Sequence, residues 1–226
     1  MEHWIFTFGK YEFNMDTLVT MWLAMGFLIV VAFITTRKLS IFPTKIQLFF
    51  ESILGMFWNL TDSLMPKTGR KHVPLIASLF LFIITANLMG QIPLKIIHLK
   101  NGEFASPTND INVTAALAII VLVYYISVGI YKRKFKFFLH DLKPISFLLM
   151  ALELLDMVTR PLTLALRLFG NILAGECLIA AIMGICAYVL PLPFMLFELL
   201  VAVVQALVFS LLTTVYISSA IEEQHE

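Results

Sequence analysis

The sequence contains few charged residues and a large excess of apolar ones. Only 14% of its 226 residues are charged, whereas 60% are hydrophobic and 20 are phenylalanine; a soluble domain has about 25% charged residues. A soluble fold of this size cannot bury so much apolar surface, because a small domain keeps much of its surface in water. The net charge of +1 offers no attraction for a polyanion. The composition therefore excludes a soluble enzyme, a disordered segment and a nucleic-acid-binding protein, and it predicts a chain solvated by lipid.

Motifs for catalysis or cofactor binding are also missing. The sequence has no GxxxxGK[ST] phosphate loop, no GxGxxG turn, no HExxH zinc helix and no GxSxG elbow. Its five histidines are scattered through end segments and connections. Cys177 and Cys186 are nine residues apart, on opposite faces of a helix, so they cannot form a disulfide within it. We expect no metal, no cofactor and no bond-making chemistry, and instead a passage for charge.

The apolar runs predict an all-α integral membrane protein that forms a single membrane domain over residues 1–226. A helix needs about 20 apolar residues to cross a bilayer. Five membrane-embedded helices are predicted, at residues 17–36, 73–94, 111–131, 145–190 and 194–219. Residues 44–65 are predicted to form an amphipathic helix at the membrane interface, because apolar residues recur there every three or four positions. Residues 1–16 and 220–226 are the terminal segments.

Basic residues predict the orientation of these helices. Three of them, Lys10, Lys95 and Lys100, fall on one side of the predicted topology. Eleven fall on the other side: Arg37, Lys38, Lys45, Lys67, Arg70, Lys71, Lys132, Arg133, Lys134, Lys136 and Lys143. Loops rich in lysine and arginine remain in the cytoplasm. Residues 1–16 are therefore expected outside, and the acidic tail at 220–226 in the cytoplasm.

The run at residues 145–190 is too long for an ordinary span. As one helix its 46 residues would measure about 69 Å, whereas the hydrocarbon core is about 30 Å thick. It is either two spans with a turn near residues 170–175 or one steeply tilted helix. Glu176 and Glu198 have their midpoint at residue 187, and Arg167 and Gln205 have theirs at residue 186. An antiparallel hairpin would bring each pair to one level, which favours the single helix.

Two arginines, Arg160 and Arg167, lie inside this apolar run. A charged side chain is costly within a bilayer and indicates a function or a buried partner. For Arg160 the alternative is a structural bridge to Asp156, which lies four residues earlier. Arg167 has no acidic residue three or four positions away. Polar and small residues form one stripe along this helix, which contains both arginines and is expected to face protein or water. The stripe consists of Glu153, Asp156, Arg160, Thr163, Arg167, Gly170, Asn171 and Ala174.

Several motifs resemble subunit a of F-type ATP synthases. The most specific is LALRLFGN at residues 164–171, followed by AGE at 174–176. Further similar segments are QALVF at 205–209, LTTVY at 212–216, NLMG at 87–90 and PTNDINVT at 107–114. The resemblance covers residues 74–114 and 141–220, whereas the N-terminal third matches only in hydropathy and order.

The resemblance implies a stator subunit that is not an enzyme on its own. Two offset half-channels would carry protons to and from carboxylates on a rotating ring, with the last two helices forming a long, steeply tilted hairpin. The implied partners are a ring of small c-type subunits, peripheral-stalk b-type subunits, the soluble ATPase sector and membrane lipid. The implied location is an energy-transducing membrane, expected to be the bacterial inner membrane.

The resemblance also assigns ion-translocation roles to eight residues. Arg167 takes the position of the arginine that faces the ring. The resemblance places Asn171, Glu176, Glu198 and Gln205 in the outer half-channel, with Asp110 near the entrance of that half-channel. It places Glu153 and Asp156 near the cytoplasmic exit. Some relatives have a histidine where this chain has Glu198.

Alternative functions remain open at this stage. The coupling ion could be sodium, since its ligands would lie largely on the ring. A stand-alone transporter or channel would also explain intramembrane charges, but the sequence shows no inverted repeat and no paired broken helices. A membrane enzyme using Glu153 and Asp156 lacks a nucleophile or a metal-binding set.

Overall fold

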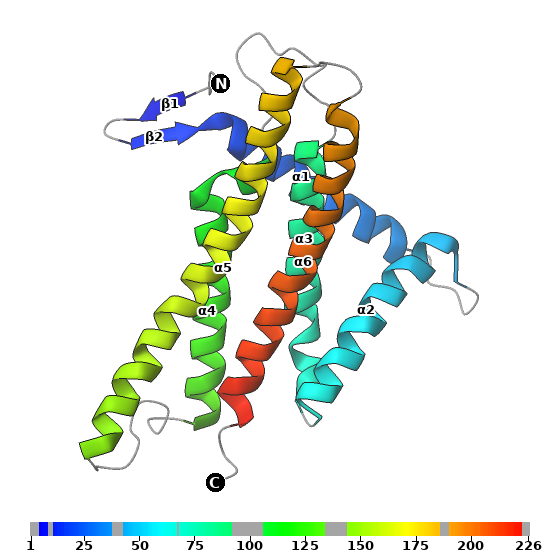
Figure 1. The fold of residues 1–226 in the computed structure, drawn as a ribbon. Helices are drawn as coiled ribbons and strands as arrows, with labels where there is room; N and C mark the ends of the chain where they lie inside the picture. The colour runs from blue at the N-terminus through cyan, green and yellow to red at the C-terminus, as the bar shows by residue number, and fades with distance from the viewer. Residues whose placement is uncertain are drawn as a thin grey trace.

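A computed structural model describes residues 5–8, 11–37, 43–66, 68–91, 106–133, 144–185 and 190–222 (Figure 1). Its elements, in chain order, are β1 (Ile5–Phe8), β2 (Tyr11–Asn14), α1 (Met15–Thr36), α2 (Lys45–Leu64), the 3₁₀ turn η1 (Gly69–Lys71), α3 (Val73–Gln91), the 3₁₀ turn η3 (Pro107–Asn109), α4 (Ile111–Arg133), α5 (Pro144–Ile185) and α6 (Pro191–Glu222). The fold is a helical bundle. The only described strands form a small antiparallel hairpin, which the apolar runs do not predict.

Five of the described helices, α1, α3, α4, α5 and α6, are long and apolar enough to cross a membrane. Their outer surfaces are apolar too: Trp22, Phe27, Ile29 and Phe33 of α1 are all more than half exposed. Such a surface suits lipid rather than water. The prediction of an α-helical membrane protein with five spans is confirmed at this level.

The core lies where α3, α4, α5 and α6 meet. Ile76 and Ile83 of α3, Leu164 of α5, and Phe209 and Ile217 of α6 are fully buried there. This side-chain packing sets the relative positions of the four helices.

Helix α2 packs against the bundle along one side only. Phe57 is buried and meets Phe80 of α3 edge to face, with ring centroids 5.3 Å apart. Phe49 and Trp58 remain exposed on α2. The helix is amphipathic, as its sequence predicts, and its location at the membrane interface stays a prediction.

Helix α5 is one continuous helix of 42 residues that passes through Pro161 without interruption. No turn occurs at residues 170–175, so the alternative of two shorter spans is wrong. At about 1.5 Å per residue, α5 is about 63 Å long.

Helix α6 begins at Pro191, three residues before the predicted start at Phe194. Pro191 and Pro193 lie in its first turn, where backbone N–H groups have no helical partner, so proline is tolerated there. Figure 1 shows α5 and α6 running in opposite directions and separating toward the C-terminal end of α6. Three predicted parts lie outside the described residues: 92–94 of the predicted helix at 73–94, 186–189 of the long run, and the tail from 223 onward.

Candidate functional site

Arg167 lies on the exposed side of α5. Thr163, Asn171 and Ala174 of the polar stripe are exposed along the same helix, whereas Leu164 and Leu168 on its other side are fully buried. None of the described residues forms an ion pair or a hydrogen bond with the Arg167 guanidinium. The arginine is therefore presented at the surface of an apolar helix, available to a group from outside this chain.

Asn171 links α5 to α6 one turn beyond Arg167. Its Nδ2 donates a hydrogen bond to Oε1 of Gln205 over 2.8 Å. The sequence predicts Arg167 level with Gln205, whereas the residue that bonds Gln205 is Asn171, one helical turn further along α5. Gln205 is only 4% exposed, and its Nε2 has no hydrogen-bond partner among the described residues. Such a buried donor is a natural site for an ordered water.

The side chain of Glu198 in α6 lies against α5 at Gly175. Its side chain is 7% exposed, and a Cβ on Gly175 would lie 2.6 Å from Glu198 Oε1. Glycine leaves room for the carboxylate at this point, and with a larger residue the Glu198 side chain would have to shift. The contact places Glu198 beside the residue that precedes Glu176, so both acids of the predicted outer path lie at the same level along α5 and α6.

Glu176 has a partner that sequence reasoning missed. Asn109 of η3 donates from Nδ2 to Glu176 Oε2 over 2.6 Å. The two residues are 67 positions apart, so no local spacing could pair them. The available signal was a cluster of small polar residues, SPTN at 106–109, between apolar spans.

Further buried hydrogen bonds hold η3 against the bundle. Thr108 Oγ1 donates to Asn87 Oδ1 of α3 over 2.8 Å, and Asn87 Nδ2 donates to the carbonyl of Ala202 in α6 over 3.2 Å. Ser106 Oγ donates to the carbonyl of Ala86 over 3.1 Å. These bonds position the turn that carries Asn109.

Asp110 caps α4 and joins it to the N-terminal segment. Its Oδ1 accepts from the backbone N and the Nδ2 of Asn112, at 2.8 and 2.9 Å. Its Oδ2 accepts from Asn14 Nδ2 at 3.0 Å. The structure thus gives Asp110 a structural task, and its role near a channel entrance stays a prediction.

At the end of α5 predicted to face the cytoplasm, Asp156 has a side chain that is 66% exposed and lies 3.7 Å from Arg160. The expected bridge between these residues is present, although such an exposed pair contributes little stability. The Glu153 side chain lies outside the described part of the structure. Across the described residues, no three His, Cys, Asp or Glu side chains are grouped to hold a metal ion.

Comparison with known proteins identifies the family. The family model described as ATP synthase A chain matches residues 18–218. The chain belongs to the ATP synthase A chain family. It is similar to the ATP synthase subunit a of Gloeobacter violaceus (strain ATCC 29082 / PCC 7421), with 41% identity over 226 residues, which are 100% of this chain and 91% of that relative.

Membership of the ATP synthase A chain family agrees with the resemblance seen in the sequence. It identifies a non-catalytic subunit of the membrane sector, and with five apolar helices it indicates a multi-pass protein of an energy-transducing membrane. The matched range includes every helix from α2 to α5 and all eight predicted site residues.

Proposed function

We propose that this chain is the stator subunit that carries protons to and from carboxylates on a rotating ring, through two half-channels separated by Arg167. The observation that carries the proposal is the exposed Arg167, which has no partner among the described residues, within the apolar segment Val158–Gly184. An arginine in hydrocarbon costs between about 3 and 17 kcal/mol. A carboxylate on the ring would supply the compensating negative charge.

Arg167 acts on the ring through its charge. A fixed cation beside a carboxylate favours the ionised form, so each passing ring site releases its ion. The same charge repels a cation that would cross directly between the half-channels. Each elementary charge crossing about 100 mV releases roughly 2.3 kcal/mol, and a direct leak would dissipate this energy.

The outer half-channel follows the polar groups on the outer side of Arg167. Glu176, Glu198 and Gln205 lie between α5 and α6, and Asn109 holds the Glu176 carboxylate in place. Carboxylates and amides at hydrogen-bond distances can pass a proton, with ordered water at the Gln205 amide. Asp110 lies at the outer end of this path.

The inner half-channel begins on the other side of Arg167. Glu153 and Asp156 precede it by 14 and 11 residues on α5, which is about 21 and 17 Å along the helix. The exposed Asp156 carboxylate is suited to exchange protons with the cytoplasm.

The long helices imply tilt. The apolar segment Val158–Gly184 has 27 residues, about 40 Å of helix, against a hydrocarbon core of about 30 Å. A segment longer than the core tilts, so α5 and α6 form a steeply tilted hairpin beside the ring, and α2 lies at the cytoplasmic interface.

Isolation of the complex tests this function directly. We expect the chain, extracted in mild detergent, to co-purify with a ring of small subunits, b-type peripheral-stalk subunits and the soluble ATPase sector. In vesicles, ATP hydrolysis should move protons, and adding sodium without a proton gradient should not support synthesis. A chain that purifies alone and transports ions would instead be a stand-alone transporter, and sodium-dependent synthesis would identify sodium as the coupling ion.

A tag at Glu226 tests the orientation. We expect the tag to be accessible only from the cytoplasmic side, because the basic loops flanking the spans remain there. A tag before residue 5 is the matched control and should be accessible only from outside. Accessibility of the Glu226 tag from outside would contradict the proposed topology in the bacterial inner membrane.

A further inference from the structure

Polar side chains bridge α5 and α6 on both sides of Arg167. On the outer side is the bond between Asn171 and Gln205, one turn away. On the inner side, two turns away, Arg160 Nη1 donates to Ser219 Oγ over 3.0 Å. The arginine that faces outward therefore lies between two cross-helix bonds.

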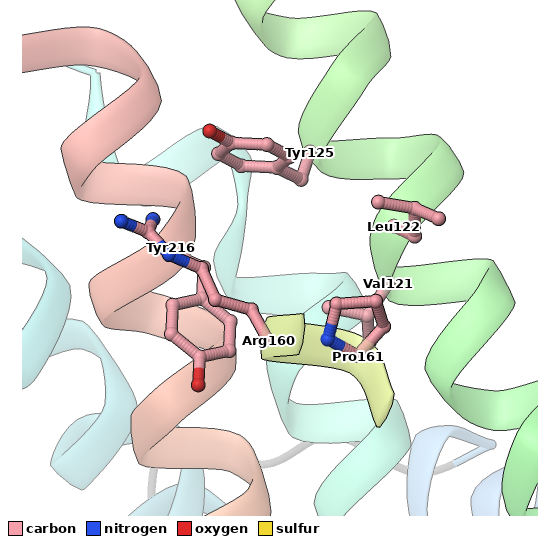
Figure 2. Close-up of a pocket in the computed structure, with 6 residues that line it drawn as sticks. All are labelled: Val121, Leu122, Tyr125, Arg160, Pro161 and Tyr216. Atoms are coloured by element: carbon pink, nitrogen blue, oxygen red, sulfur yellow. The ribbon is translucent and has the colours of Figure 1, made fainter. Parts of the chain in front are cut away.

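The inner bridge has more than one contact. The guanidinium carbon of Arg160 lies 5.3 Å from the centroid of the Tyr216 ring, within the range of a cation–π interaction. Ser219 also donates to the carbonyl of Tyr216 over 2.9 Å, which fixes its hydroxyl one turn along α6. Figure 2 shows the Arg160 side chain reaching from α5 toward α6, close to the Tyr216 ring.

The contacts of Arg160 with Ser219 and Tyr216 lie where α4, α5 and α6 meet. Val121, Leu122 and Tyr125 of α4 line the pocket beside Arg160 and Pro161 (Figure 2). The Arg160 side chain is only 32% exposed there. Figure 1 shows α5 and α6 separating toward this end, so a long side chain is needed to connect them.

Asp156 does not account for the position of Arg160. The distance between their charged groups is 3.7 Å and the Asp156 side chain is 66% exposed, so solvent screens the pair. The bond to Ser219 is shorter, involves a charged donor and is partly buried, which makes it the stronger contact.

We propose that Arg160 is a positioning residue, whose bonds to Ser219 and Tyr216 hold α5 on α6 and thereby set where Arg167 meets the ring; this rests on the proposed function of Arg167. The two arginines are seven residues apart, about 10 Å along one helix and nearly on the same face. A helix transmits a shift over two turns with little loss. Movement of α5 at Arg160 therefore displaces Arg167.

The test uses the assembled ATP synthase in vesicles, with rates expressed per assembled complex. Arg160→Gln should lower ATP synthesis about tenfold or more, because displacing a working group by about 1 Å is costly. It should also raise passive proton leak, because a displaced Arg167 no longer separates the half-channels. Arg160→Lys should recover part of the synthesis, since an ammonium can bond Ser219 but lacks the planar fork.

Substitutions of the aromatic partner separate positioning from general stability. Tyr216→Phe should behave as wild type, because the ring face is retained, whereas Tyr216→Leu should resemble Arg160→Gln. The double variant Arg160→Gln/Tyr216→Leu should be no worse than either single one, as expected for one shared interaction. Arg70→Gln, which removes an exposed arginine bound to Asp62 at 3.2 Å, is the matched control and should leave leak and synthesis unchanged.

The outcomes distinguish this proposal from the function on which it rests. Normal synthesis and normal proton leak in Arg160→Gln overturn the positioning role. The role is also overturned if the variant assembles less complex but each assembled complex works at the wild-type rate. If Arg160→Gln does not assemble, Arg160→Lys, Tyr216→Phe and Tyr216→Leu test the role instead. They are judged by the same rates of synthesis and proton leak per assembled complex. Normal synthesis in Arg167→Ala would instead overturn the proposed function itself.

Discussion

Arg167→Ala is expected to abolish ion-driven ATP synthesis while the complex still assembles. The loss should exceed about a hundredfold, which corresponds to roughly 2.7 kcal/mol of barrier. The reason is that Arg167 is exposed and bonded to none of the described residues, so its removal takes away a charge without breaking a hydrogen bond or ion pair among them. The measurement is ATP synthesis in vesicles under an imposed proton gradient, with subunit content checked in parallel.

Two variants control for this result. Arg167→Lys keeps the charge but loses the planar guanidinium, so synthesis should remain low but measurable. Arg70→Ala removes an arginine that is exposed outside the apolar spans and should leave synthesis unchanged. Synthesis at the wild-type rate in Arg167→Ala would show that the ring does not depend on this charge.

The double variant Glu176→Gln/Glu198→Gln is expected to slow proton passage severely. Glutamine keeps the size and most hydrogen bonds of each side chain but cannot take up and release a proton. Groups that transfer protons contribute about 10²- to 10⁴-fold to rates, so we expect a loss of at least about a hundredfold in the double variant. Each single variant should lose less, because the other carboxylate remains at the same level along α5 and α6.

Proton flux through the reconstituted complex, measured across pH for the wild type and the three variants, tests this relay. The pH dependence should change together with the rate, because titratable groups of the path have been removed. Glu51→Gln is the matched control, since that glutamate bonds Gln47 on α2, away from the path. An unchanged rate and pH profile in the double variant would rule out the relay and leave Arg167 as the essential charge.

The helices were predictable because each depends on local sequence. A run of about 20 apolar residues is sufficient to identify a span, and five such runs became α1, α3, α4, α5 and α6. The exact start of α6 does not follow from the sequence, because a proline can end a helix or begin one, and Pro191 begins α6. The β1–β2 hairpin was missed because its four-residue strands carry too little pattern.

The contacts between helices were predictable only in part. The arginine without a nearby acid was evident from spacing along one helix, and the structure leaves Arg167 exposed. The bond from Asn109 to Glu176 and the bond from Arg160 to Ser219 join residues 67 and 59 positions apart. Such pairs depend on how whole helices pack, and so does the choice of Asn171, rather than Arg167, as the partner of Gln205.

The bond between Asn87 and Ala202 has a consequence for biogenesis. The two residues are 115 positions apart, so α3 leaves the ribosome long before α6 exists. Until then the Asn87 side chain, fully enclosed in the finished fold, lacks its carbonyl partner in an environment where an unsatisfied amide is costly. The C-terminal end of α3 therefore completes its hydrogen bonds only once α6 is in place, and translation must reach the sixth helix before the first half of the protein is complete.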